Sequence, residues 1–353
     1  MKKKWKILTV GLLVLSLAIS LLAGCGSSKD AASDGKKVTK LKFTHHNPPN
    51  AFVCTQGMEP WAKEIEKKTG GQVKIDIYPS STLAKPQDAY DSVIKGTADI
   101  AWGYITYYPG RFPLTEVLNL PMLGVNKATM GSKVIWELFQ KTPAMQKEFA
   151  DVKVLMLHTH DGAPVTSRKP INNLDDMAGK KLRTAGGPLV PYLQSIGASP
   201  MAMPAPDTYQ ATEKGVIDGA VMAWEAVEML NLQEVAKNAV DANVASGTFF
   251  LIMNKKAWDS LTPEQQKVFE EESGDKASQL FAKAWDNTKT SSTNKFTKAG
   301  GKILTPDAAE LARWKEKAKP VWDKWANDLE AKGLPGKAVL ADTLQLIEKY
   351  KGQ

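Results

Sequence analysis

The chain has 353 residues, of which 43% are hydrophobic and 24% charged, an ordinary globular composition with room for two domains. Its net charge of +8 falls to +4 without the four lysines between positions 2 and 6. With no run of five like charges, this small and dispersed excess argues against a nucleic-acid partner.

The N-terminus has the pattern of an exported, lipid-modified protein. Basic residues from Lys2 to Lys6 precede an apolar run from Ile7 to Leu22, which is short for a membrane span and typical of a signal peptide. The run closes with Leu22-Ala23-Gly24-Cys25, which resembles the lipobox of bacterial lipoproteins. This resemblance implies a signal peptide over residues 1–24 and lipid on Cys25; the alternative is a plain membrane anchor with an incidental cysteine.

The segment after Cys25 is predicted to be a flexible tether, because residues 26–37 have no large apolar side chain to bury. With Cys25 modified, Cys54 has no partner for an intramolecular disulfide. Its position between Phe52 and Thr55 favours a packed small side chain over a reactive thiol. We therefore expect an extracytoplasmic domain that is anchored to a bacterial membrane and folds without disulfides.

Strands and helices are predicted to alternate along the rest of the chain. The expected strands cover residues 38–44, 72–78, 98–102 and 152–158, then 181–185, 200–203, 218–223 and 247–253. The expected helices cover residues 58–69, 87–95, 127–141, 188–196, 206–214, 307–331 and 337–350. A capping box, Thr262-Pro263-Glu264-Gln265, opens a further helical stretch that reaches Lys298 with a break near Gly274. The rhythm predicts an α/β fold with parallel-rich sheets, restarting after residue 160 as two lobes that the chain crosses more than once.

One pattern, Tyr-x4-Lys-Gly-x2-Asp-x-Ala, occurs twice, at residues 90–101 and 209–220. Each copy predicts a helix that ends at a left-handed glycine, followed by a short turn and a strand. The repetition indicates the same helix-to-strand joint in each lobe, with the departing strands directed towards a cleft; a chance match is the alternative.

Residues that could carry enzyme chemistry are few. The chain has no nucleophile elbow, P-loop, dinucleotide fingerprint or CxxC pair, so we expect no catalytic residue and no cofactor. His158 and His160 are the best metal candidates because alternate strand residues share a face, but no third ligand is evident. They support a rival hypothesis, a secreted metal-dependent hydrolase. The alternative is a strand end with solvated or cleft-lining histidines.

Arg183 is the strongest candidate for ligand binding. It lies near the carboxyl end of the predicted strand 181–185, where open α/β sheets bind ligands, and a guanidinium can clamp a carboxylate. Gly186 allows a close backbone approach before a helix N-terminus that favours an anion. The alternative is a surface arginine on a basic turn.

Several motifs around Arg183 resemble a known family. They are Ser-Arg-Lys-Pro-Ile (167–171), Leu174-Asp175-Asp176-Met177-x-Gly179, Lys181-Leu182-Arg183, Gly197-Ala198-Ser199-Pro200 and Tyr209 to Gly219. In this order and spacing they resemble the extracytoplasmic solute-binding proteins of TRAP transporters, the DctP type, over about residues 38–320. The resemblance implies a two-lobed, type II-like periplasmic-binding-protein fold, an organic-acid ligand and a membrane permease driven by an ion gradient. It also implies lobe I over 38–160 with 249–288, lobe II over 161–248 with 289–318, and C-terminal helices over 319–353.

The resemblance assigns site residues too. In the family, the arginine of the Lys-x-Arg strand grips the ligand carboxylate, and Arg183 matches it. The other expected ligand-facing residues are His46, Asn47, Trp102 and Tyr104 in the first lobe, and Gly186, Met222 and Trp224 in the second.

Departures from the family pattern indicate the ligand. Pro164 and Met222 stand where the family often has polar groups, and Ala205 where it often has an aromatic. A second carboxylate would therefore lose its hydration without compensation, whereas aromatic residues such as Tyr107 offer apolar walls. We expect a monocarboxylate or 2-oxo acid with an apolar or aromatic body; a C4-dicarboxylate is the alternative.

Overall fold

The computed structural model describes residues 38–352. The expected signal peptide, the expected lipidation site Cys25 and the expected tether lie outside the described residues. Across residues 38–352, no helix combines the length and the apolar character that a membrane span requires.

The first sheet in the described part has five strands in the order β2-β1-β3-β10-β4. Its strands are β1 (Thr39–Thr44), β2 (Val73–Tyr78), β3 (Ile100–Tyr104), β4 (Val152–Thr159) and β10 (Thr248–Asn254). β1 pairs in parallel with β2 and β3, whereas β10 lies antiparallel between β3 and β4. All seven residues of β10 are buried, as expected for an apolar run in the middle of a sheet that is covered on both faces.

The second sheet has the order β11-β9-β5-β8-β6-β7. Its strands are β5 (Val165–Ser167), β6 (Lys181–Thr184), β7 (Ser199–Ala202), β8 (Gly219–Val221), β9 (Asn238–Val240) and β11 (Lys302–Leu304). β6 is parallel to β7 and β8, but β5 is antiparallel to β8 and β9. Both sheets are thus mixed but rich in parallel strands, as expected, because among the described strands β10 alone runs against the others in the first sheet and β5 alone in the second. The expected strands were found, but β5, β9 and β11 were missed because three residues are too few to show a period of two.

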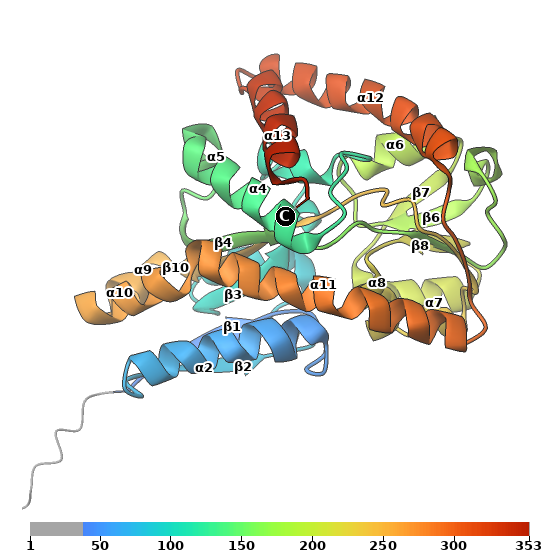
Figure 1. Cartoon of the computed structure of the whole chain (residues 1–353). Coiled ribbons are helices and arrows are strands. Elements are labelled where there is room, and N and C mark those ends of the chain that lie inside the picture. Colours follow the sequence, from blue (N-terminus) through green and yellow to red (C-terminus); the bar gives the residue numbers. More distant parts are fainter. Residues whose placement is uncertain (1–37, 353) are drawn as a thin grey trace, which may run out of the picture. The chain divides into compact units, whose positions relative to one another are not determined.

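Helices cover both sheets (Figure 1). They are α2 (Glu59–Lys68), α3 (Ala89–Ile94), α4 (Ala128–Lys141), α5 (Pro143–Lys147), α6 (Leu189–Ser195), α7 (Thr208–Glu213), α8 (Trp224–Met229), α9 (Lys255–Asp259), α10 (Pro263–Glu272), α11 (Gly274–Lys298), α12 (Ala308–Glu330) and α13 (Gly336–Tyr350). The capping box is confirmed, since the Thr262 hydroxyl accepts from the Gln265 amide while the Gln265 side chain accepts from the Thr262 amide. The break near Gly274 is also confirmed, at Ser273 between α10 and α11.

Two helical segments connect the regions of the two sheets. The long helix α11, orange in Figure 1, packs against α4 and β4 of the first region and against α8 and β11 of the second. α12 packs against α6, and α13 then returns to α4. The chain therefore passes between the regions several times, which agrees with the two-lobed fold expected from the sequence.

The hydrophobic core does not follow this division, because its largest cluster joins Leu157 and Phe250 of the first sheet to Leu182 and Val221 of the second. This cluster lies around Phe112, Phe149 and Phe250, where the Phe112 and Phe149 rings stack at 4.6 Å between centroids. Another includes Phe43, Trp61 and most of the aromatic residues along β3 and β10. Burying large aromatic side chains on both faces of the first sheet fixes the positions of its carboxyl-end residues.

The repeated sequence pattern forms the same joint twice. The C-cap of α3 is Lys95, which precedes Gly96 with a φ of 75°, and the C-cap of α7 is Lys214, which precedes Gly215 with a φ of 71°. Only glycine adopts this left-handed conformation without steric cost, so the match between the copies is structural and not a coincidence.

The aspartates of the two copies make equivalent hydrogen bonds. The Asp99 carboxylate accepts from the Lys42 amide at 2.7 Å, and the Asp218 carboxylate accepts from the Lys181 amide at 2.8 Å. Each aspartate amide in turn donates to the carbonyl of the same lysine, at 2.9 and 2.7 Å. The two bonds align β3 with β1 and β8 with β6, which brings the carboxyl ends of both strand pairs to the cavity described below.

Candidate ligand-binding site

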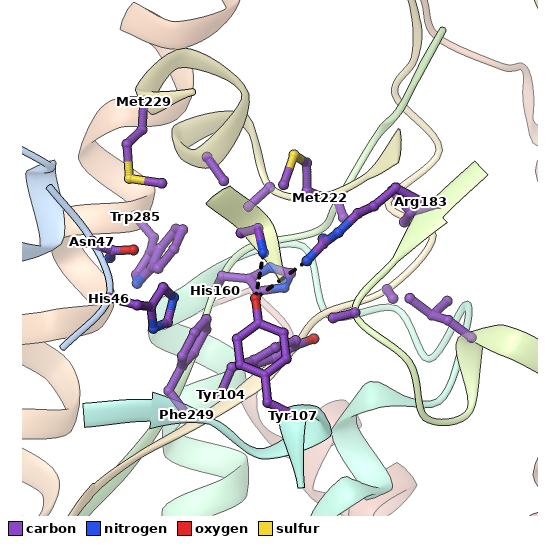
Figure 2. A pocket seen from close by; sticks show the side chains of 18 of the residues that line it. His46, Asn47, Tyr104, Tyr107, His160, Arg183, Met222, Met229, Phe249 and Trp285 are labelled. Carbon is purple, nitrogen blue, oxygen red and sulfur yellow. Dashed lines mark hydrogen bonds between the residues drawn. The ribbon is translucent and has the colours of Figure 1, made fainter. Parts of the chain in front are cut away.

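A cavity lies at the carboxyl ends of β3, β6 and β8, with walls from both sheet regions (Figure 2). The centre of a water-sized sphere can occupy ≈ 60 Å³ of this cavity, several times the volume that one bound water requires. Its polar lining residues are His46, Asn47, His160 and Arg183, and its aromatic ones are Trp102, Tyr104, Tyr107, Phe249 and Trp285. Ala163, Ala185, Leu189, Ala205, Val221, Met222, Ala223, Ala226, Met229 and Ala245 complete the lining.

Arg183 is only 3% exposed and points into this cavity from β6. Its Nε donates to the carbonyl of Met203 at 3.1 Å, and its Nη2 lies 3.4 Å from the hydroxyl of Tyr107. Among the described residues, it has no carboxylate partner. A guanidinium has five N–H donors, so three remain for a ligand. A buried cation without a counter-ion gives the cavity an electrostatic character that favours an anion.

Tyr107 completes the arginine's surroundings. Its hydroxyl oxygen accepts from Arg183 and from the backbone amide of Ala205, the latter at 2.9 Å (Figure 2). Because both bonds use the oxygen as acceptor, the hydroxyl hydrogen stays available, and no acceptor for it lies within the described part of the chain. Tyr107 can therefore donate to the same anion that Arg183 binds.

The two histidines of the cavity are neutral at neutral pH. Burial lowers the pKa of His46 to about 3, with smaller contributions from the charges of His45 and Arg183. Burial also lowers the pKa of His160 to about 4, and the charge of Arg183 adds to this shift. Of the described lining residues, Arg183 alone carries a charge at neutral pH.

Aromatic rings form one wall of the cavity around Phe249 of β10. The Phe249 ring stacks on Trp102 with centroids 4.5 Å apart and planes 8° apart. It also contacts Tyr104 at 4.7 Å and Trp285 at 5.6 Å. Flat, apolar surfaces of this kind pack well against an aromatic or apolar ligand body.

His158 is not part of the cavity. It is fully buried, and its Nε2 accepts from Trp102 Nε1 at 2.8 Å while its Nδ1 lies 3.2 Å from the Thr159 carbonyl. Both ring nitrogens are thus used inside the protein. No group of three metal-ligating side chains occurs within residues 38–352. The geometry does not provide the metal centre that the hydrolase hypothesis requires.

Comparison with known proteins identifies the family. A family profile described as bacterial extracellular solute-binding protein, family 7 (DctP), matches residues 43–328. The chain belongs to this family of TRAP transporter receptors. Over 288 residues it is 30% identical to the outer membrane transporter protein TsaT of Comamonas testosteroni, which covers 80% of this chain and 84% of that protein. Members of the DctP family are extracytoplasmic transport proteins and not enzymes.

Two solved structures of TRAP solute-binding proteins have the same fold. One, from Rhodoferax ferrireducens T118 with copurified benzoate, has a TM-score of 0.85 and 29% identity, covering 89% of this chain and 98% of that chain. The other, from Bordetella bronchiseptica with bound (R)- and (S)-mandelate, has a TM-score of 0.82 and 28% identity, covering 88% and 99%. These similarities establish the two-lobed α/β fold of the DctP-family receptor.

The structure brings six of the eight predicted ligand-facing residues of this receptor into one cavity. They are His46, Asn47, Trp102, Tyr104, Arg183 and Met222. Gly186 is not among the lining residues, although its φ of 110° is a conformation that residues with a Cβ rarely adopt. Trp224 also lies outside the lining: it is fully buried against Phe296, and its Nε1 is 3.3 Å from Asp241. The reason is local, because β8 ends at Val221 and Trp224 already begins α8.

Several lining residues of the receptor were not predicted. Phe249 belongs to the apolar run of β10, and Trp285 lies in the middle of α11. In sequence, both have the same pattern as residues that only fill the core. His160 is predicted as a metal candidate with a cleft-lining histidine as the alternative, and the structure places it in the cavity lining. Its position beside Tyr104, with ring centroids 6.3 Å apart, depends on strand pairing across the sheet.

Proposed function

We propose that this protein is a lipid-anchored TRAP receptor that captures a monocarboxylate with an aromatic or apolar body, including 2-oxo acids of this kind. The observation that carries the proposal is the buried guanidinium of Arg183, the single charge in a cavity whose other walls are mostly aromatic and aliphatic. The ligands of the two similar structures, benzoate and mandelate, each combine one carboxylate with an aromatic ring.

The same cavity argues against a C4-dicarboxylate. A second carboxylate would be taken out of water without a second cation, which costs several kcal/mol. His46 and His160 are neutral because burial lowers their pKa values, and Met222 supplies no hydrogen bond. A neutral apolar body instead gains from burial against Phe249 and Trp102.

Capture involves both lobes in this proposal. We assign lobe I to residues 38–160 with 249–288 and lobe II to residues 161–248 with 289–318. Tyr107 then belongs to lobe I, and its contact with Arg183 of lobe II crosses the cavity. A carboxylate held by both side chains favours the closed arrangement by its differential affinity. The closed receptor would deliver its ligand to the TRAP permease, while lipid on Cys25 keeps it at the membrane.

Isothermal titration calorimetry of the purified full-length protein tests the ligand class. Benzoate, mandelate and phenylpyruvate are compared with succinate and with benzamide, which has the shape of benzoate without its charge. We expect binding of at least one aromatic acid, no binding of benzamide and none of succinate. Tight succinate binding without binding of an aromatic acid would instead show a C4-dicarboxylate receptor.

The role of Arg183 is tested with Arg183→Ala. Loss of two charge-assisted hydrogen bonds is expected to weaken aromatic-acid binding by roughly 100-fold or more. Arg168→Ala, which removes an exposed arginine of the same region, is the matched control and should bind like wild type. If Arg183→Ala keeps wild-type affinity, the proposed site is wrong.

The lipid anchor needs a separate test. Mass spectrometry of the N-terminal peptide of protein expressed in bacteria should show cleavage before Cys25 and added acyl chains. Cys25→Ser should release the receptor from the membrane fraction. An unmodified Cys25 would contradict the anchor without affecting the ligand proposal.

A further inference from the structure

The part of the cavity away from Arg183 contains three buried polar side chains that lack hydrogen-bond partners. His46, Asn47 and Trp285 are 8%, 3% and 4% exposed, respectively. Trp285 Nε1 is shielded from water and has no hydrogen-bond partner in the described structure. The ring of His46 and the side-chain amide of Asn47 line the cavity, and no described residue is seen to hydrogen-bond to either side chain. Figure 2 shows the three together on one side of the pocket, with Arg183 on the other and Tyr107 and His160 between them.

These side chains come from different parts of the fold. His46 and Asn47 follow β1 of the first sheet, whereas Trp285 lies in the middle of α11. Rings fix two of them: the His46 ring lies 5.1 Å from Trp102 between centroids, and Trp285 lies 5.7 Å from His160. The polar groups are thus held in place although no hydrogen bond within the described structure holds them.

Unpaired buried polar groups destabilise a protein unless a ligand or water satisfies them. A neutral imidazole offers one donor and one acceptor, an amide offers both, and an indole offers a donor alone. A hydroxyl group can donate to one of them and accept from another. A methyl group can do neither, and a carboxylate would meet no cation at this position.

We propose that His46, Asn47 and Trp285 form a subsite for a hydroxyl substituent on the ligand body, so that the preferred ligand is a ring-hydroxylated aromatic carboxylate. The inference rests on the proposed function, in which Arg183 binds the carboxylate at the other side. The hydroxyl subsite belongs to the first-sheet side and α11, and the carboxylate subsite to β6. A ligand with both groups therefore contacts both sides of the cavity, whereas benzoate satisfies the carboxylate subsite alone.

Matched pairs of ligands test this subsite by calorimetry on the full-length protein. 3-Hydroxybenzoate is compared with 3-methylbenzoate, and 4-hydroxybenzoate with 4-methylbenzoate, since each pair differs little in shape. At one ring position at least, the hydroxyl compound should bind roughly 3- to 10-fold more tightly than its methyl partner. Equal or tighter binding of the methyl compound at both positions overturns the proposal.

Variants then locate the effect. His46→Leu and Trp285→Phe should each reduce the hydroxyl-to-methyl affinity ratio towards one, while His46→Gln, which keeps a donor and an acceptor, should preserve most of it. Trp102→Phe is the control, because the indole N–H of Trp102 is already bonded to His158. Loss of the indole should change the affinities for the hydroxyl and the methyl compound alike and leave their ratio unchanged. A ratio unchanged in His46→Leu and Trp285→Phe also overturns the subsite.

The two proposals fail in different ways. If benzoate and both methylbenzoates bind wild type but hydroxylation brings no gain, the hydroxyl subsite is wrong and the aromatic-acid receptor stands. If none of these five benzoates binds wild type, the hydroxyl subsite is wrong. If mandelate and phenylpyruvate also fail to bind, the proposed ligand class is wrong as well.

Discussion

Tyr107 and Arg183 lie 76 residues apart in the sequence, yet the tyrosine hydroxyl lies 3.4 Å from Nη2 of the arginine. Tyr107 follows β3 of the first sheet, and Arg183 lies in β6 of the second. The same hydroxyl accepts from the amide of Ala205 at 2.9 Å. This one oxygen therefore links both sides of the cavity and orients the guanidinium before a ligand arrives, which lowers the entropic cost of binding.

Tyr107→Phe should weaken carboxylate binding without unfolding the protein. The substitution removes the acceptor of Arg183 and the free hydroxyl hydrogen but keeps the ring that contacts His46 and Tyr104. A neutral hydrogen bond contributes about 1 kcal/mol, so we expect the Kd for the best aromatic acid to rise about 5- to 10-fold. Calorimetry measures this change, and an unchanged Kd would show that Tyr107 does not contact the ligand.

Gly219→Ala should destabilise the second sheet. A Cβ at Gly219 would lie 1.9 Å from the backbone carbonyl of Thr166 on β5, and backbone cannot move as a flexible side chain can. In the other copy of the repeated pattern, the fully buried Ile100 occupies the equivalent position. We expect a loss of about 2 kcal/mol or more in the free energy of unfolding, measured by urea denaturation. If Gly219→Ala unfolds at the same urea concentration as wild type, the close approach of β5 and β8 is contradicted.

The stability of the protein should fall as the pH rises above 6.5. Burial raises the pKa of Asp161 to about 7 and that of Glu225 to about 8, and the charge of Asp161 adds to the rise at Glu225. The folded state therefore keeps protons that the unfolded state releases near pH 4 to 4.5, so its stability is lost as the pH passes these folded pKa values. Buried histidines with lowered pKa values oppose this trend only below about pH 6.5.

Glu225→Gln isolates one contribution to this pH dependence. The amide carries no charge, so the variant should exceed wild type in unfolding free energy at pH 8.5 by about 1 kcal/mol or more, with a smaller difference at pH 6. Urea denaturation at both pH values measures the effect. Glu213→Gln, on the exposed face of α7, is the control and should leave the pH dependence unchanged.

Cys54 should not react in the folded protein. It is 2% exposed, its Sγ lies 3.8 Å from Nδ1 of His45, and burial raises the pKa of its thiol well above the ordinary value. A protonated thiol is a poor nucleophile. Iodoacetamide at pH 8 should leave the peptide that contains Cys54 unmodified by mass spectrometry, but modify it fully in guanidinium chloride. Modification of the native protein would contradict the buried, structural role.

Much of the fold could be read from local sequence, because the signals are local. A period of two or 3.6 located the long strands and helices, and the capping box at Thr262 marked the start of α10. The repeated pattern predicted matching joints, since a left-handed glycine after a helix and an aspartate before a strand need only neighbouring residues. The strands of three residues had no such signal, and they were missed.

The candidate site was predicted in part. Arg183 could be found because its strand, the following glycines and the family motifs agree on one position. Trp224 could not be placed in this way, since the change from β8 to α8 turns its side chain into the core against Phe296. Phe249 and Trp285 could not be found either, because an aromatic residue that lines a cavity and one that fills a core have the same sequence pattern.

The amino-acid sequence alone determined that this chain is built of alternating helices and strands and that one helix-to-strand joint occurs twice. It also predicted Arg183 as the residue that binds an anion. All of these depend on backbone conformation or on neighbours a few residues apart. Only the tertiary structure decided that Arg183 is the single charge among the described residues of its cavity and that Tyr107, which follows a strand of the other sheet, reaches it. The unpaired group of His46, Asn47 and Trp285 also emerged only there, because burial and hydrogen-bond partners are set by residues that are distant in sequence.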